Sequence, residues 1–437
     1  MFFIYTLLYA MAALLLLPRE LKKRPKGGRM DWLSQKLGRI ENENAAHGDR
    51  TVWVHAVSVG EVLAAAPFVE ALQARGFAVV VSTITETGRR VARERFFSPG
   101  SRVIYLPFDL PFAFKRAAKC IRPCAFVLVE TELWPNAVRT MHGLGVPVFI
   151  VNGRLSEKSA AGYRRLRFFF RRVLKMVSLI CVQDALYARR AEVMGAEKEK
   201  ILITGNFKFD TDPKGKDKKP PPAQKWTERM SGPVIVAGST HPGEEEFLLS
   251  VFEKLRTGFP SLTLVLVPRH PERAPEVESL IKKAGFRCVR SSMANEWQGE
   301  WNGGLPEKIK IVLVDTVGEL FGIYAKADLA VMGGSFCRRG GQNPLEPAYW
   351  GKPVICGPDM SNFPFMGDFL SSGGAVTVEK EALTGIAAKL LADGGRRAEM
   401  GERARRFYLE HAGAVKKTVE AMTGVLGAGE CLKGEDE

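Results

Sequence analysis

Short apolar runs alternate with longer amphipathic stretches along most of the chain from about residue 50 onward. In the first half the runs are VWVHAV, AVVVSTI, VIYLPF, AFVLVE, VPVFIVN, LICVQD and ILITGN; in the second half they are PVIVAGST, LTLVLVPR, IKIVLVD, LAVMGG and PVICGP. Continuous apolar strands that alternate with helices are typical of parallel sheets built from β–α–β units. The pattern therefore predicts an α/β fold with two doubly wound, Rossmann-like domains.

The alternation is interrupted once, over residues 211–232, where charged residues and prolines follow one another without periodicity. Such a segment is typical of an exposed linker. We expect an N-terminal domain over residues 31–210, a C-terminal domain over 233–425 and a flexible tail over 426–437. In doubly wound folds ligands bind at the carboxyl ends of the strands, which predicts a ligand site in an interdomain cleft.

The first 17 residues, MFFIYTLLYAMAALLLL, carry no charge, and a basic segment follows them. Their number is near the lower limit for crossing a hydrocarbon core of about 30 Å, and a small-residue cleavage site does not follow. We expect residues 1–30 to form a membrane anchor with a basic flank, which places the rest of the chain on the cytoplasmic face. The alternative is an apolar helix that packs on the protein itself.

Charge narrows the choice of partners. The 437 residues have a formal net charge of +15, which favours nucleic acid, anionic lipid or a phosphorylated or carboxylated substrate. Residues 154–176 contain eight basic residues around the triplet Phe168 to Phe170, a combination suited to anionic lipid. Nucleic acid is not expected, because no RNP, helix-turn-helix or zinc pattern occurs. The seven cysteines form no C-x-x-C pair and are interpreted as reduced thiols.

Polar or glycine-containing loops follow several predicted strands and begin helices. They are SVGE (58–61), AGSTHPGEEE (237–246), PRHPER (268–273), DTVGEL (315–320) and GGQNPLE (340–346). The chain lacks both G-x-G-x-x-G after a first strand and the P-loop motif, which argues against dinucleotide oxidoreductases and P-loop NTPases. Loops of this kind present backbone N–H groups to a phosphate, so we expect a nucleotide-type ligand in the second half. Gly333, Gly334, Gly340 and Gly341 are expected to let the backbone approach that ligand.

Six motifs, VHAVSVGE, ETELWPN, GNFKFD, PRHPER, TVGEL and GGSFCRRGGQNPLEP, together resemble the family of 3-deoxy-D-manno-octulosonic acid (Kdo) transferases of lipopolysaccharide assembly. The resemblance extends over about residues 1–420. It implies a GT-B fold, a CMP-Kdo donor, a lipid A precursor (lipid IVA) as acceptor and inversion at the anomeric carbon. It also implies a monotopic protein on the cytoplasmic face of the inner membrane, with neither a metal nor another cofactor.

Three residues of the first domain are candidates for the chemistry. Glu61 lies at a strand-to-helix junction, where it can either accept a proton from a sugar hydroxyl or stabilise the helix start; the resemblance makes it the general base. Glu130 ends a buried strand, with Glu132 as a competitor and an internal ion pair as the alternative; the resemblance makes Glu130 a transition-state residue. By the same resemblance Lys208 stabilises the transition state, by offsetting negative charge on the leaving CMP.

The resemblance assigns the CMP contacts to the second domain: Arg269, His270, Val317, Gly318, Glu319, Asn343, Pro344, Leu345 and Glu346. Asn343 is a candidate N-cap and Pro344 suits the first helical position. Glu346 follows in the first turn, where a carboxylate can accept hydrogen bonds from a ribose diol. Val317 stands where the family pattern has methionine, which a backbone contact would tolerate.

Asp210-Thr211-Asp212 spells a D-x-D sequence, but a CMP-sugar has one phosphate and we expect no metal there. Two further hypotheses remain open: another GT-B nucleotide-sugar transferase or 2-epimerase with a different donor, and a nonenzymatic membrane-associated binding protein in which Glu61 is structural.

Overall fold

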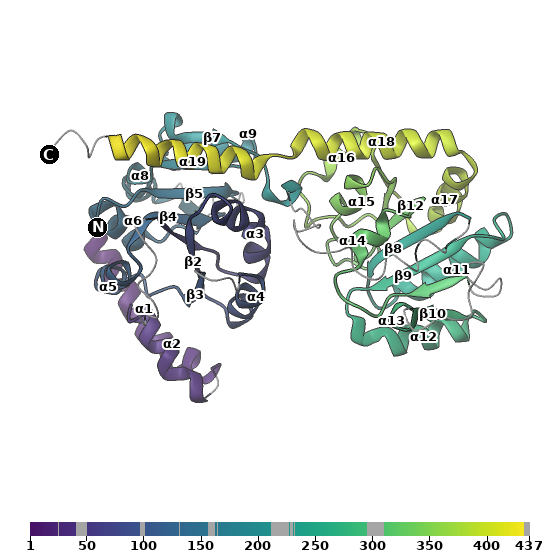
Figure 1. Cartoon of the computed structure of the whole chain (residues 1–437), viewed down its shortest axis with the longest axis horizontal. Coiled ribbons are helices and arrows are strands. Elements are labelled where there is room, and N and C mark those ends of the chain that lie inside the picture. Colours follow the sequence, from purple (N-terminus) through teal and green to yellow (C-terminus); the bar gives the residue numbers. More distant parts are fainter. Residues whose placement is uncertain are drawn as a thin grey trace. The chain divides into compact units, whose positions relative to one another are not determined.

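Buried strands form two parallel sheets of seven strands each in the computed structural model, one in each half of the chain (Figure 1). The structure describes residues 1–24, 26–40, 50–96, 101–130, 132–155, 162–163, 165–210, 227, 230, 232–294 and 310–431. The described chain divides into two units: Met1–Thr211 with His411–Glu437, and Asp212–Glu410. The predicted α/β fold with two parallel-sheet domains is confirmed.

The first sheet reverses its strand order between β1 and β4. Its order is β3 (Arg102–Tyr105), β2 (Ala78–Thr83), β1 (Thr51–His55), β4 (Pro123–Val129), β5 (Val148–Gly153), β6 (Leu179–Val182) and β7 (Ile201–Ile203). In register, Trp53 of β1 lies between Val80 and Phe126. All five residues of β1 are buried because helices cover both faces of the sheet.

Two apolar clusters hold the helices of the first unit against its sheet. The helices are α2 (Arg29–Lys36), α3 (Val59–Gln73), α4 (Glu86–Phe96), α5 (Pro111–Ile121), α6 (Pro135–Gly143), α8 (Arg167–Lys175) and α9 (Ala185–Met194). One cluster contains Trp53, Phe114 and Phe126 together with residues of α5, α6 and α8, and the other contains Phe68 and Phe207 with residues of α3 and α4. The result is a three-layer α/β unit.

The second sheet reverses its order between β8 and β12. Its order is β10 (Cys288–Arg290), β11 (Ile311–Leu313), β9 (Thr263–Pro268), β8 (Val234–Thr240), β12 (Leu329–Met332), β13 (Val354–Cys356) and β14 (Ala375–Thr377). Its helices are α11 (Glu244–Arg256), α12 (Ala274–Lys283), α13 (Ser291–Ala294), α14 (Leu320–Tyr324), α15 (Leu345–Tyr349), α16 (Met366–Ser371), α17 (Leu383–Ala392) and α18 (Gly394–His411).

The last helix, α19 (Ala414–Cys431), belongs to the first unit and contacts α3 (Figure 1). Val415, Val419 and Met422 are buried in the core cluster of that unit. The carboxylate of Asp210 accepts hydrogen bonds from two backbone N–H groups at the start of α19. The expected end of the second domain at residue 425 is therefore wrong, because α19 packs in the core of the first unit. Residues 426–431, expected in a flexible tail, belong to this helix, whereas 432–437 lie outside the described residues. Most of the expected linker, 211–232, lies outside the described residues.

Helix α1 (Phe2–Lys22) is long and apolar enough to cross a membrane by length and composition. Its exposed apolar side chains include Phe3, Ile4, Leu7, Leu8, Leu14, Leu15 and Leu16. Other α1 side chains pack on the first unit: the ring of Phe2 lies 5.2 Å from that of Phe169. One side of this helix is thus packed on the first unit, as the alternative expects, and the other side is exposed. The membrane anchor stays a prediction.

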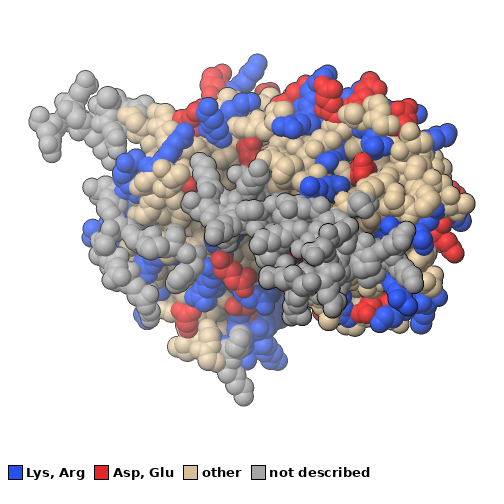
Figure 2. Space-filling model, turned by 45° about the vertical axis from the view of Figure 1, so that its right-hand side comes forward, with Lys and Arg blue, Asp and Glu red and all other residues tan. Residues whose placement is uncertain are grey.

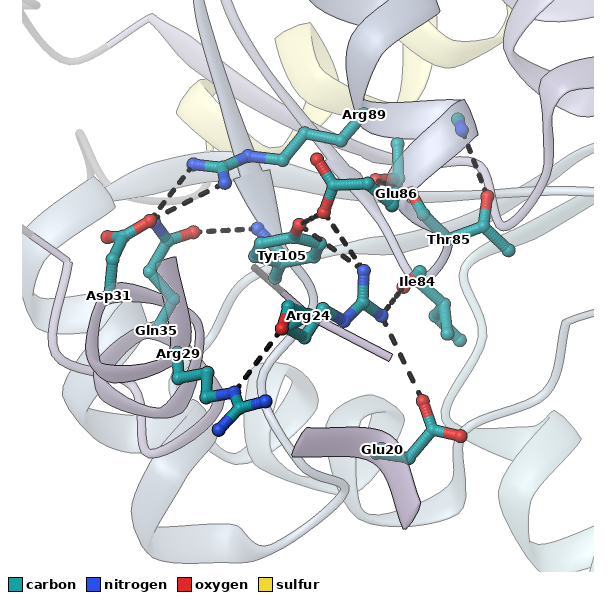
Figure 3. A network of polar contacts seen from close by, with 12 residues as sticks. Glu20, Arg24, Arg29, Asp31, Gln35, Ile84, Thr85, Glu86, Arg89 and Tyr105 are labelled. Carbon is teal, nitrogen blue, oxygen red and sulfur yellow. Dashed lines mark hydrogen bonds and ion pairs between the residues drawn. The ribbon is translucent and has the colours of Figure 1, made fainter. Parts of the chain in front are cut away.

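The chain just beyond α1 is fixed by a polar network that joins it to α2, α4 and β3 (Figure 3). Arg24, only 8% exposed, donates to Glu86 Oε2 at 3.0 Å, and its guanidinium lies over the rings of Trp32 and Tyr105. Glu86 also accepts a hydrogen bond from the hydroxyl of Tyr105. This end of the helix is therefore part of the folded unit.

Lys and Arg side chains are spread over the face shown in Figure 2, with Asp and Glu among them.

Candidate functional site

Two glutamates follow the adjacent strands β1 and β4, at the point where the first sheet reverses its order. Glu61 lies in the first turn of α3, and Glu130 directly follows β4. Carboxyl strand ends at such a reversal are the usual ligand position of doubly wound sheets. The structure thus places both predicted residues at the expected edge.

Glu61 serves the start of its own helix. Its Oε2 accepts a hydrogen bond from the backbone N–H of Val57 at 2.7 Å, and its Oε1 accepts one from Ser58 Oγ at 3.2 Å. Burial raises the pKa of Glu61 to about 7, and the charges of Glu130 and Glu132 add to this rise. A half-buried carboxylate that titrates near neutral pH suits a general base, so the stabilising contact and the catalytic role are compatible.

Glu130 is held in the left-handed region, with φ 62°, and forms an ion pair with Arg154 Nε at 2.8 Å. The ion pair expected as the alternative is therefore present. Burial raises the pKa of the neighbouring Glu132, and the charge of Glu130 raises it further. Arg154 was not among the predicted site residues; its place directly after β5, beside the reversal of the sheet, was the available signal.

Lys208 lies in a short 3-10 helix, Phe207–Asp210, that follows β7. The N–H of Phe207 donates to Asn152 Oδ1 at 3.1 Å, which ties this turn to β5. Burial lowers the pKa of Lys208, the charge of Arg154 lowers it further, and that of Glu130 raises it. Lys208, Arg154 and Glu130 therefore form one electrostatic group. Within the D-x-D sequence, Asp210 binds the start of α19, whereas Thr211 and Asp212 lie outside the described residues.

In the second unit, a buried glutamate uses the backbone N–H groups that sequence analysis expected to be available to a phosphate. Glu244, 1% exposed, accepts from the N–H of His241 at 2.9 Å, of Gly334 at 2.8 Å and of Phe336 at 3.0 Å. The N–H of Gly340 donates to Asp359 Oδ2 at 2.8 Å. In the expected loops the N–H groups of His241 and Gly340 are therefore accepted by carboxylates of the chain itself and are not free for a phosphate. For the loops 268–273 and 315–320 the expectation stays a prediction.

The glycines of these loops are also required by close contacts within the protein. A Cβ at Gly333 would lie 2.2 Å from the carbonyl oxygen of Ser239, and one at Gly341 would lie 2.2 Å from Met360 Sδ. A Cβ at Gly340 would meet the side chain of Asn362. Three of the four glycines expected to approach a ligand therefore approach the protein's own atoms. Gly334, with φ 70°, needs its glycine for the turn itself.

Glu346 lies in the first turn of α15 and is half-buried. Burial raises its pKa to about 7, while a hydrogen bond from Asn343 Nδ2 at 3.4 Å and the charge of Arg269 lower it. Asn343 Oδ1 accepts from the N–H of Leu345 at 3.2 Å, but the N-cap residue is Pro344, so the prediction of Asn343 as N-cap is wrong by one position. The helix begins at Leu345, one residue later than predicted, so Pro344 precedes it.

The remaining predicted residues of the second unit follow β9 and β11. His270 is 57% exposed, and its ring lies 6.2 Å from that of His241, a neighbour that sequence analysis missed. The side chain of Val317 is 84% exposed and Gly318 has φ 88°. Glu319 is 8% exposed, and within the described residues its Oε2 has no hydrogen-bond partner. Burial raises the pKa of Glu319.

Among the described residues, no three His, Cys, Asp or Glu side chains gather in a way that would hold a metal ion.

Comparison with known proteins gives three findings. A family model described as 3-deoxy-D-manno-octulosonic-acid transferase (kdotransferase) matches residues 31–211. The 3-deoxy-D-manno-octulosonic acid transferase of Haemophilus influenzae is 35% identical over 379 residues, which are 85% of this chain and 86% of that protein. The transferase of the same name from Bordetella pertussis is 33% identical over 440 residues, which are 97% of this chain and 99% of that protein. The UDP-GlcNAc 2-epimerase of Neisseria meningitidis, solved with UDP-GlcNAc, has a TM-score of 0.56 over 86% of this chain and all of its own, at 12% identity, which shows a shared fold.

Proposed function

Because the chain belongs to the 3-deoxy-D-manno-octulosonic acid (Kdo) transferase family of lipopolysaccharide biosynthesis, we propose that it transfers Kdo from CMP-Kdo to a lipid A precursor with inversion at the anomeric carbon. The first unit binds the acceptor and carries the base. The second unit binds CMP through the residues after β9, β11 and β12.

In the proposed step, an acceptor hydroxyl attacks the anomeric carbon of Kdo from the face opposite the phosphate. The new C–O bond forms as the bond to the phosphate oxygen breaks, and CMP leaves with that electron pair. Glu61 takes the proton of the hydroxyl. Glu130 and Lys208 stabilise the charges that develop, and Arg154 holds Glu130 in place through their ion pair.

The observation that carries this assignment is the state of Glu61. A carboxylate with an ordinary pKa is a weak base at neutral pH, whereas burial beside Glu130 and Glu132 raises the pKa of Glu61 to about 7. General bases work best when their pKa lies near the working pH. The arrangement therefore supports proton abstraction by Glu61.

We also propose that the enzyme lies on the cytoplasmic face of the inner membrane. The exposed apolar side of α1 would enter the bilayer interface, and α8 adds Phe168, 59% exposed, among exposed arginines on the same helix. An apolar segment together with a basic patch forms a two-signal attachment, which is stronger than either alone. Phe169, by contrast, is buried against α1 and does not face lipid.

The test is turnover of purified full-length protein with CMP-Kdo and tetraacylated lipid A precursor, followed by release of CMP and by mass spectrometry of the glycolipid. A product heavier by whole Kdo units supports the proposal, and release of CMP without a heavier glycolipid contradicts it. Calorimetric titration with CMP and with UDP separates this donor from that of another GT-B transferase or epimerase. Preference for UDP would reject CMP-Kdo as donor.

A further inference from the structure

The first turns of α1 contact the segment that leads from β4 into α6. Tyr5 Oη donates to Asp109 Oδ2 at 2.8 Å, and Asn136 Nδ2 donates to Thr6 Oγ1 at 3.0 Å. The ring of Tyr9 meets that of Trp134 edge-on, with centroids 6.5 Å apart. Residues 5, 6 and 9 lie on one side of a helix, so this side of α1 is committed to the first unit.

Asp109 is the centre of these contacts. Its side chain is fully buried; Oδ1 accepts from the N–H of Ala137 at 2.7 Å, and Oδ2 accepts from the N–H of Asn136 at 3.1 Å. These are amides of the first turn of α6, whose own N-cap residue, Trp134, makes no side-chain capping bond. Asp109 therefore caps α6 from a distant point of the chain, and the hydroxyl of Tyr5 fixes the same carboxylate.

The capped segment leads directly to the candidate catalytic carboxylates. Glu132 lies two residues before Trp134, and the ring of Trp134 lies 6.2 Å from that of His55 at the end of β1. Two residues after His55, the N–H of Val57 binds Glu61. Trp134 thus contacts the end of β1 and belongs to the segment that follows β4, and Tyr9 of α1 packs against it.

The other end of α1 is fixed as well, since Arg24 binds Glu86 and the carbonyl oxygen of Ile84 (Figure 3). A helix that served only to reach a bilayer would not require specific polar contacts at both ends. These contacts indicate a role inside the unit in addition to membrane attachment.

We propose that Tyr5 and Asp109 are positioning residues of the transferase site, which hold the segment Glu132–Trp134 and so set where the carboxylates after β4 lie relative to Glu61. The expected effect on kcat rests on the proposed function. The structural part of the proposal, that α1 stabilises the start of α6, does not depend on that function.

The test uses the full-length protein in detergent micelles, so that membrane attachment does not limit the rate. Tyr5→Phe keeps the ring contacts of Tyr5 and removes the bond to Asp109. We expect kcat to fall about tenfold, as small displacements of catalytic groups typically do, with an unchanged KM for the donor. Rates are normalised to CMP-binding sites counted by calorimetry. Thr423→Val, which removes a hydroxyl that binds Val419 O within α19, is the control and should keep the wild-type rate.

The pH profile separates positioning from general support of the fold. If the segment after β4 loosens, Glu130 and Glu132 raise the pKa of Glu61 less, and the acid limb of kcat moves to lower pH. A Tyr5→Phe enzyme with wild-type kcat per site contradicts the proposal, and so does one that is merely less heat-stable with an unmoved acid limb.

Amide hydrogen exchange gives a readout that is independent of the reaction. The N–H groups of Asn136 and Ala137 should exchange faster in Tyr5→Phe than in wild type without any substrate. Equal exchange overturns the proposed hold even if transfer of Kdo is confirmed. Faster exchange in a protein that transfers no Kdo would refute the proposed function and keep the structural part.

Discussion

The two units begin their sheets with the same local arrangement and use it differently. After β1 the sequence Gly60-Glu61 opens α3, and after β8 the sequence Gly243-Glu244 leads into α11. Glu61 is half-buried and accepts one backbone N–H and one serine hydroxyl. Glu244 is almost fully buried and accepts three backbone N–H groups.

The difference comes from the neighbouring loop rather than from the motif. In the second unit the glycine-rich loop after β12 brings two of its N–H groups to Glu244, so the carboxylate holds that loop in place. In the first unit the segment after β4 brings Glu130 and Glu132, whose charges raise the pKa of Glu61. A glutamate at the start of the first helix is thus structural in one unit and a candidate base in the other.

The largest effect is expected when the structural glutamate is removed. Glu244→Ala leaves three buried N–H groups without an acceptor, and each such loss costs about 1–3 kcal/mol. We expect the second unit to lose about 4 kcal/mol or more of its free energy of unfolding, measured by urea denaturation, and CMP binding to disappear. A variant that unfolds within about 1 kcal/mol of wild type would show that the loop does not depend on Glu244.

Whereas Glu244→Ala should lower the stability, Glu61→Gln should lower turnover and leave the stability close to that of wild type. It keeps the size of the side chain and one acceptor oxygen, but not the basicity, so turnover should fall by roughly 10²-fold or more. The acid limb of kcat, which in wild type rises with pH through about 7 as Glu61 loses its proton, should vanish. Single-turnover assays at saturating donor and thermal unfolding measure the two properties. Near-normal turnover would make Glu61 a helix-start stabiliser and move the search for the base to Glu132.

What can be predicted from the sequence also differs between the two units, because the role of a residue depends on the neighbouring loop. Strand-end position was sufficient to predict that Glu61 and Glu130 lie after adjacent strands, because a parallel sheet brings its carboxyl ends to one edge. Their roles, and that of Glu346, stay predictions. The role of Glu244 and of the tight glycines could not be inferred, since it depends on which distant loop packs on them. The return of α19 to the first unit was missed likewise, because an apolar helix face does not by itself indicate which core covers it, and the bonds from Asp210 join residues that are distant in the sequence.

Substitution of Glu346 tests whether a carboxylate of the second unit binds the ligand rather than stabilises the fold. With Arg269 nearby and few internal hydrogen bonds, its burial costs free energy that a bound ribose could offset. Glu346→Ala should weaken CMP binding about tenfold or more, the equivalent of one lost charged hydrogen bond, measured by calorimetry. Glu402→Ala removes an acid on α18 that is 71% exposed in the same unit and serves as the control. Equal CMP affinity in both variants would remove Glu346 from the proposed site.

The smallest effects are expected at Val317, where the chain departs from the family pattern, and at the adjacent Gly318. The Val317 side chain is 84% exposed, so a contact with CMP at this position would come from the backbone. Val317→Ala should then change CMP affinity by no more than about twofold, as surface substitutions usually do.

Gly318 has φ 88°, and a Cβ there would meet no atom within 4 Å. The cost of Gly318→Ala is therefore backbone strain alone, about 1 kcal/mol, which predicts an affinity about fivefold lower if the loop must keep this shape to bind CMP. A larger loss for Val317→Ala than for Gly318→Ala would mean that the ligand packs on the valine side chain. The loop would then recognise CMP by apolar contact, in contrast to the polar strand ends elsewhere in this unit.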